Sequence, residues 1–243
     1  MKNLSSLFLL SLLCFASCDK AENELSFENY YENIYTVSSN GYVAPEWEDT
    51  LHKVMNISAF DLEPGDRARL VLKEYYDSEV TDFPEMTIER FIKKIPMYQL
   101  SGNGVINSDE YNAYITSINR YSIGEYYRYP IWAWKGVLNV NATFNGASNG
   151  AQFAMSVIKV ENDTIDLQLH IKADASSGKR SEELLSFDLR SLKNVLESSD
   201  LSKLSSHKTL KARIFGLCMY NEKLANRQLP DPEFLCEFEN PFY

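Results

Sequence analysis

The sequence predicts an all-β chain with minor helix, in which the C-terminal half forms an antiparallel β-sandwich. The first observation is sustained alternation of apolar and polar residues from Ile131 onward, which is typical of strands with one buried face. The clearest apolar sets are Leu138, Val140, Ala142 and Phe144, and then Ile165, Leu167, Leu169 and Ile171. The second observation is the composition, because 15 Tyr and 13 Phe beside 10 Gly and 8 Pro favour a folded β-rich protein over disorder.

The N-terminal half begins with three candidate strands. Tyr30–Val37 is a run of β-branched and aromatic residues that ends at the turn signal Ser38–Gly41. Val54–Phe60 is the second candidate, and the turn Pro64–Asp66 leads into the third, Arg67–Tyr76. In the third strand the set that should face a core is Ala68, Leu70 and Leu72, and the opposite set is Arg67, Arg69 and Lys73.

Two stretches have the spacing of amphipathic helices. Apolar residues from Ile88 to Ile95 recur at i, i+3, i+4 and i+7, but Pro96 would end a helix there. Pro96 and the isoleucines of this stretch also suit a bulged or edge strand, and we predict a strand rather than a helix there. Tyr111–Ile118 shows the same spacing behind an N-cap at Ser108, and we predict a helix there.

The remaining elements follow closely in the second half. A Gly- and Asn-rich turn at Gly146–Gly150 precedes a strand that begins at Phe153. Leu185–Leu189 alternates in the same way and leads to a short helical connection over Leu192–Leu201. The last alternating sets are Leu210, Ala212 and Ile214, and then Phe234, Cys236 and Phe238. The change of pattern near Arg120 to Tyr129 predicts two domains, residues 30–120 and residues 121–243.

The N-terminus has the layout of a bacterial lipoprotein signal peptide. Lys2 supplies a positive charge, Leu7–Phe15 is a short apolar run, and small residues directly precede Cys18. We therefore expect residues 1–17 to be removed, Cys18 to carry acyl chains, and residues 18–29 to form a polar tether. The partner implied is a membrane, and we expect the outer membrane of a bacterial cell envelope, on its periplasmic or surface side.

The net charge of the chain and its number of cysteines limit the partners and the disulfides that it can have. A net charge of −10 repels phosphate backbones, so we predict no nucleic-acid partner. Cys14 leaves with the signal peptide and Cys18 is acylated, which leaves Cys218 and Cys236. In an oxidising envelope this pair can form a disulfide, and the alternative is two buried thiols that act as small hydrophobes.

One segment fits a catalytic motif. Gly146–Gly150 matches G-x-S-x-G, the nucleophile elbow of serine hydrolases, with Ser148 as the nucleophile. That elbow needs a strand before it and a helix after it, whereas strand-like sequence lies on both sides here. His170 and His207 have no surrounding β/α pattern, and Asn-Gly pairs are typical of hairpin turns. We therefore predict that the chain is not an enzyme, with a serine hydrolase using Ser148 as the alternative.

We predict no cofactor and no metal site. Asn103–Glu110 is similar to the second half of an EF-hand loop, but Gln99 and Ser101 stand where the first calcium ligands would be. The histidines His52, His170 and His207 are far apart in the sequence and lack metal-ligand spacing.

An aromatic cluster surrounds the proposed domain boundary. The candidate ligand platform is Tyr126, Tyr127, Tyr129 and Trp132. Aromatic faces stack on sugar rings or on apolar side chains of a partner, so a glycan and an envelope protein are the ligand classes considered. The alternative is that these rings, with Tyr121 and Trp134, fill the seam between two small domains, and we expect this of Trp134 in particular.

Several short pieces of the chain together resemble the NigD-like lipoproteins of Bacteroides and its relatives. They are Gly65-Asp66-Arg67, Ile123-Gly124, Pro130-Ile131 with Trp134, Leu138-Asn139-Val140, Leu167–Ala173 with its central His170, and Phe187-Asp188-Leu189. Leu169 stands where this family usually has Arg. The resemblance spans Tyr30 to the C-terminus and implies an N-terminal OB-like barrel, a C-terminal β-sandwich and a strand over Met86–Leu100. It brings no established catalytic or ligand residues to this chain.

These observations predict a non-enzymatic lipoprotein of the cell envelope that works as a binding or interaction module. OB-like barrels bind oligosaccharides, peptides and nucleic acids, and the acidic charge disfavours the last of these. Beside the serine hydrolase, the second alternative is a purely structural subunit of an envelope complex.

Overall fold

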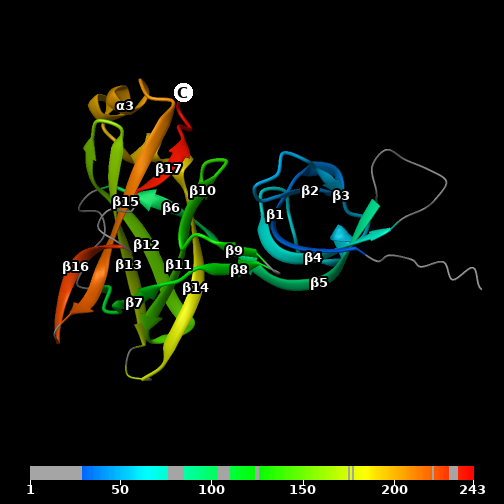
Figure 1. Ribbon diagram of the computed structural model, residues 1–243, viewed down its shortest axis with the longest axis horizontal. Coiled ribbons are helices and arrows are strands. Elements are labelled where there is room, and N and C mark those ends of the chain that lie inside the picture. Colours follow the sequence, from blue (N-terminus) through cyan, green and yellow to red (C-terminus); the bar gives the residue numbers. More distant parts are fainter. Residues whose placement is uncertain are drawn as a thin grey trace, which may run out of the picture.

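The computed structural model describes residues 29–75, 85–102, 110–123, 126–174, 176, 178–220, 222–229 and 235–243. The predicted signal peptide, the lipidation site Cys18, almost all of the tether and the cap at Ser108 lie outside these residues. The described chain is predominantly β, which confirms the predicted fold class. Strands from the first part of the chain form one β body, and the later strands form a second beside it (Figure 1).

The first body is an antiparallel sheet curled into an OB-like barrel. Its strands are β1 (Tyr30–Val37), β2 (Tyr42–Pro45), β3 (His52–Lys53), β4 (Arg67–Tyr75) and β5 (Glu85–Ile95), with 3₁₀ turns η1 (Ser39–Gly41) and η2 (Ile57–Ala59). Their order is β3-β2-β1-β4-β5, and a parallel bridge between Val54 and Met86 joins the two ends. Five strands closed in this way are typical of the partly open OB barrel, as the resemblance implied. The predicted core face of β4 is buried inside it.

The second body holds the other large sheet. Its strands are β6 (Met97–Ser101), β7 (Ile115–Ile118), β10 (Ile131–Trp134), β11 (Val137–Asn145), β12 (Ala147–Glu161), β13 (Thr164–Asp174), β14 (Arg180–Asp188), β15 (Thr209–Tyr220), β16 (Lys223–Leu229) and β17 (Cys236–Glu239). Seven described strands form a closed circuit, β7-β11-β14-β6-β12-β13-β15, because β7 pairs with both β11 and β15. The predicted sandwich is therefore joined at its edges around one apolar core.

Short elements complete this body. A separate hairpin, β8 (Tyr121–Ile123) and β9 (Tyr126–Arg128), lies near the junction of the two bodies (Figure 1). The helical connection predicted from the sequence is present as η5 (Leu189–Ser191), α2 (Leu192–Val195) and α3 (Ser198–Leu204). Among the described residues no helix is long and apolar enough to cross a membrane.

The two bodies divide at Pro96, and not near Arg120 as the change of pattern predicted. β6 lies inside the second sheet, where it pairs in parallel with β12 and with β14. β7 belongs to the same sheet. The chain therefore passes from β5 to β6 through Pro96 alone, and this residue interrupts the ladder because it has no N–H donor. Sequence on both sides of Pro96 is β-like, so no change of composition marks the crossing.

Two local predictions are wrong and one is confirmed. Tyr111–Ile118 is not a helix, because Ala113 bridges to Ile171 and β7 pairs with β11, so tertiary pairing overrides the local period. Val54–Phe60 is not a strand, since Val54 makes a single bridge and the chain then turns at η2. Met86–Leu100 is β-structure, as the resemblance implied, and β5 is bulged against β4.

Candidate functional site

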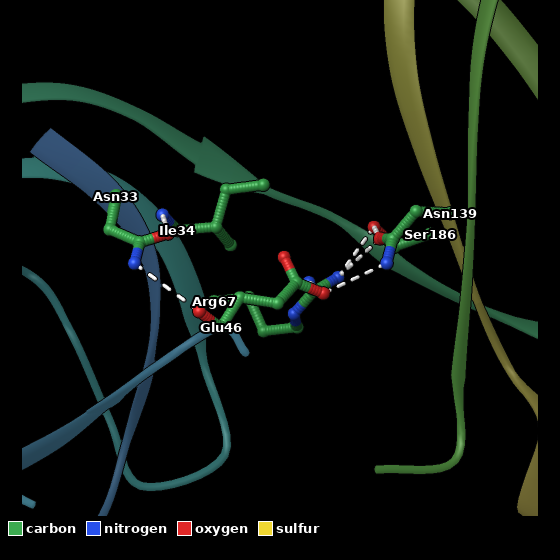
Figure 2. Close-up of polar contacts among 6 residues, drawn as sticks. All are labelled: Asn33, Ile34, Glu46, Arg67, Asn139 and Ser186. Atoms are coloured by element: carbon green, nitrogen blue, oxygen red, sulfur yellow. Dashed lines mark hydrogen bonds and ion pairs between the residues drawn. The ribbon is translucent and has the colours of Figure 1, made fainter. Parts of the chain in front are cut away.

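A buried polar network joins the two bodies (Figure 2). Arg67 starts β4 on the face opposite the barrel interior, yet it is only 3% exposed. Its Nη2 donates to Glu46 Oε1 at 2.8 Å, and its Nη1 donates to Asn139 Oδ1 at 3.0 Å and to Ser186 Oγ at 2.6 Å. Asn139 Nδ2 donates to the same Glu46 oxygen at 2.9 Å. Desolvation lowers the pKa of Arg67, and the Glu46 carboxylate opposes this change.

An apolar cluster lies in the same seam. Its buried members come from both bodies and are Ile34, Ile95, Tyr121, Ile123, Trp132 and Leu184, with Trp47 packed against them. Trp132 is 6% exposed, and its ring centroid lies 5.5 Å from that of Trp47 and 6.0 Å from that of Tyr121. Trp132 is therefore interdomain core and offers no face to a ligand, which corrects its place in the predicted platform.

The other aromatic residues of the predicted platform have different surroundings. Tyr129 is 71% exposed. Tyr126 and Tyr127 lie in β9, and their side chains fall outside the described part of the structure. Trp134, which we expected in the core, is only partly buried and has Lys135 Nζ 5.6 Å from its ring centroid. The structure thus does not bring the four platform residues together as one described surface.

Ser148 does not form a nucleophile elbow. It is exposed within β12, which continues as strand to Glu161 without a following helix. His170 lies opposite Ala154, whereas Ala147, the neighbour of Ser148, lies opposite Asp174, which is roughly 13 Å along β13 from His170. A hydrogen bond of 3.0 Å instead links His170 Nε2 to Ser156 Oγ, and Ser156 is buried. No carboxylate of the described chain bonds to His170, so an orienting acid is absent from this pair.

The two cysteines are free thiols and are not bridged. They lie on paired antiparallel strands, as predicted, but the register places Cys236 opposite Ala212 on β15. Cys218 lies farther along β15, opposite Ala225 of β16. The resulting separation of about 20 Å along the strand far exceeds the roughly 7 Å between Cα atoms that a disulfide allows. The predicted disulfide is therefore wrong, and the alternative of two thiols holds.

We expect the two thiols to react with iodoacetamide at very different rates in the folded protein. Cys218 is partly exposed, whereas Cys236 is buried and its burial raises the pKa of the thiol to about 12. The thiolate is the reactive form, so alkylation should modify Cys218 first and leave Cys236 intact. Mass spectrometry of the digested protein measures both sites. Denaturation without a reductant should expose both, and a need for reductant would contradict the free thiols.

An open groove of about 850 Å³ lies in the second body where β7 separates from β15. The two strands pair at one position, Ile115 opposite Cys218. Beyond it, residues 116–118 line one side of the groove and residues 227–229 of β16 line the other. Ile115 and Leu229 are buried at its base, and partly buried Cys218 lies beside them.

Gly216 makes the base of the groove possible. A Cβ at this position would overlap Ile115 Cδ1 and would lie 2.9 Å from Leu229 Cδ1. The absence of a side chain therefore lets two apolar side chains from different strands meet over β15. An isolated glycine in an alternating strand marks such a close approach, and it is the one signal in the sequence that points here.

The groove has a positive electrostatic character. Among the described residues, its lining includes Arg180, at the start of β14, and Arg227 of β16, but no Asp, Glu or His. Burial raises the pKa of the Cys218 thiol, and the positive charge of Arg227 partly offsets this change. The groove cannot be predicted from the sequence because its residues come from four strands, and only the pairing of the sheet assembles them.

Comparisons with known proteins give the fold. No family model and no curated protein matches the chain. A solved protein of unknown function from Bacteroides vulgatus has 16% identity and a TM-score of 0.55, covering 84% of this chain and 93% of its own. A NigD-like immunity protein from Bacteroides caccae has 12% identity and a TM-score of 0.53, covering 87% and 96%. The chain has the NigD-like fold.

A third solved structure extends the likeness. A candidate lipoprotein from Bacteroides fragilis has 14% identity to this chain and a TM-score of 0.54, covering 87% of this chain and 98% of its own. Within this NigD-like fold, Gly65 precedes β4 with a φ of 94°, which favours glycine, and its N–H donates to Val37 O at 2.8 Å. His170 is in β13 and Phe187 in β14, so the residues that carry the resemblance lie in the strands it implied.

No group of described residues could hold a metal ion.

Proposed function

We propose that this chain is a lipid-anchored, non-enzymatic lipoprotein of the cell envelope, with its anchor in the outer membrane, and that it works by binding a partner. The layout around Cys18 supports the anchor, and the similarity to a candidate lipoprotein supports the same location. One similar structure is a NigD-like immunity protein, and known immunity proteins act by tight binding.

The groove between β7 and β16 carries the proposal that the function is binding. It is concave and has an apolar base, as ligand sites do. In the part of the chain that the structure describes, its lining has guanidinium groups but no carboxylate or imidazole, the groups that most often act as general acid or base. The raised pKa of Cys218 also keeps that thiol protonated and a poor nucleophile. The groove is therefore better equipped to hold a ligand than to transform one.

The anchor is tested by replacing Cys18 with Ala. We expect this change to abolish metabolic labelling with an acyl-lipid precursor and to release the protein from membranes. The physical reason is that each buried CH₂ of an acyl chain contributes about 0.8 kcal/mol to membrane binding, which the soluble body cannot replace. The matched control is Cys218→Ala, which should keep the label. Continued labelling of Cys18→Ala would show that the anchor lies elsewhere.

Binding and catalysis are separated by a fluorophosphonate probe, which labels activated serines. We expect no labelling of Ser148 or Ser156, because neither has a base together with an orienting acid. Labelling that disappears in Ser148→Ala or Ser156→Ala would identify an activated serine. It would show that the chain is a serine hydrolase and would contradict the proposed binding function.

A further inference from the structure

We propose that the groove between β7 and β16 binds an extended, acidic segment of a partner protein by strand addition to β7. The inference rests on the proposed binding function and names the chemistry of the partner. Three features carry it, and they are the open edge of β7, the apolar base of the groove and the charge of its lining.

The first feature is the edge of β7. On one side β7 pairs with β11, from Ile115 to Ile118. On the other side it pairs with β15 only at Ile115, so no described strand continues the ladder along residues 116–118. An exposed strand edge of this kind is where an extended peptide adds to a sheet, because its backbone groups supply the hydrogen bonds.

The second feature is the base of the groove. Side chains of an extended peptide alternate between two faces, so every second residue of a peptide paired with β7 would point toward Ile115, Cys218 and Leu229. These groups are apolar or weakly polar, and the volume of about 850 Å³ is large enough for several side chains. Small or β-branched residues therefore fit the positions that face the base.

The third feature is charge complementarity. The whole chain carries a net charge of −10, yet the described residues that line this groove include Arg180 and Arg227 and no carboxylate. Arginine pairs with carboxylates through two parallel hydrogen bonds, so the alternate side chains of the partner should be Asp or Glu. The same positive charges repel a basic segment, so the groove should bind acidic segments in preference to basic ones.

The alkylation rate of Cys218 reports occupancy of the groove in the mature, lipidated chain in detergent. The probe is a short acetylated peptide that alternates valine with glutamate, and the control peptide alternates valine with lysine. We expect the valine–glutamate peptide to slow alkylation of Cys218 about tenfold at saturation, without changing Cys236. The lysine peptide should give no protection, and backbone N-methylation of the glutamate peptide should remove its effect.

Charge reversal gives the decisive variant. Arg180→Glu with Arg227→Glu should exchange the preference, so that the lysine peptide protects Cys218 and the glutamate peptide does not. Lys172→Glu, an exposed change on β13, is the matched control and should keep the original preference. If the double variant fails to fold by circular dichroism, Arg180→Gln, at an exposed position, should weaken the glutamate peptide alone.

The outcomes separate the inference from the proposed function. Equal protection by both peptides, no protection by either, or protection that survives charge reversal would overturn strand addition of an acidic segment. Self-association of the chain that protects Cys218 without peptide would assign the groove to a second copy and overturn it too. None of these results would change the expected lipid labelling at Cys18 or the expected absence of fluorophosphonate labelling at a serine. Loss of those two results would instead remove the proposed function.

Discussion

Replacing Arg67 with Ala is expected to lower the free energy of unfolding by about 3–5 kcal/mol, because it leaves the buried Glu46 carboxylate without its cation. The same change removes the donors to Asn139 Oδ1 and Ser186 Oγ, which are also fully buried. Urea denaturation followed by circular dichroism measures the effect. The loss should appear as a lower midpoint, since the surface exposed on unfolding hardly changes.

Two further variants show whether the loss comes from burial of the charge. Arg90→Ala removes a side chain that is 65% exposed and lies 3.7 Å from Glu32, so it should cost at most about 0.5 kcal/mol. Arg67→Met combined with Glu46→Leu removes both charges, and we expect it to recover most of the stability, because apolar replacements of a buried pair are often neutral. A cost for Arg67→Ala no greater than that for Arg90→Ala would mean that water reaches the pair.

The seam also shows what alternation along a strand can and cannot predict. The apolar set of β11, including Leu138 and Phe144, is fully buried, as the pattern required. The same alternation predicts that Asn139 and Asn141, on the opposite face, are exposed to water, but both are buried. They lie against polar partners, Asn139 on Glu46 and Arg67 and Asn141 on Glu182. A polar face turned to water and one turned to buried hydrogen-bond partners have the same sequence pattern.

Long-range pairing is the other part that local pattern could not supply. The period-two signal identified most strands of the second body, but it contains no information on which strands are neighbours. The insertion of β6 between β12 and β14 moved the boundary to Pro96, and the register of β15 with β17 separated Cys218 from Cys236. The groove depends on the same pairing, since the described residues of β7 and β15 pair only at Ile115 and Cys218 and the groove lies where the two strands then separate.

Replacing Trp132 with Ala is expected to destabilise the chain by about 3–5 kcal/mol, because it empties the centre of the apolar seam cluster. Trp47 and Tyr121 would each lose an aromatic neighbour, and their rings come from different bodies of the fold. Thermal and urea unfolding both measure the change. If Trp132 served a ligand instead, the truncation would leave the stability almost unaffected and reduce binding.

Two matched changes at aromatic positions complete this test. Trp132→Phe keeps most of the packing and removes Nε1, a buried donor without a hydrogen-bond partner, so its cost should stay below about 1.5 kcal/mol. Tyr129→Ala changes a ring that is 71% exposed and should shift stability by no more than about 0.5 kcal/mol. The two residues are only three positions apart in the chain, so their place in the sequence is closely matched. We therefore attribute the large difference expected in the cost of Trp132→Ala and Tyr129→Ala to the burial of the Trp132 ring. Equal costs for these two variants would show that the seam does not close over Trp132.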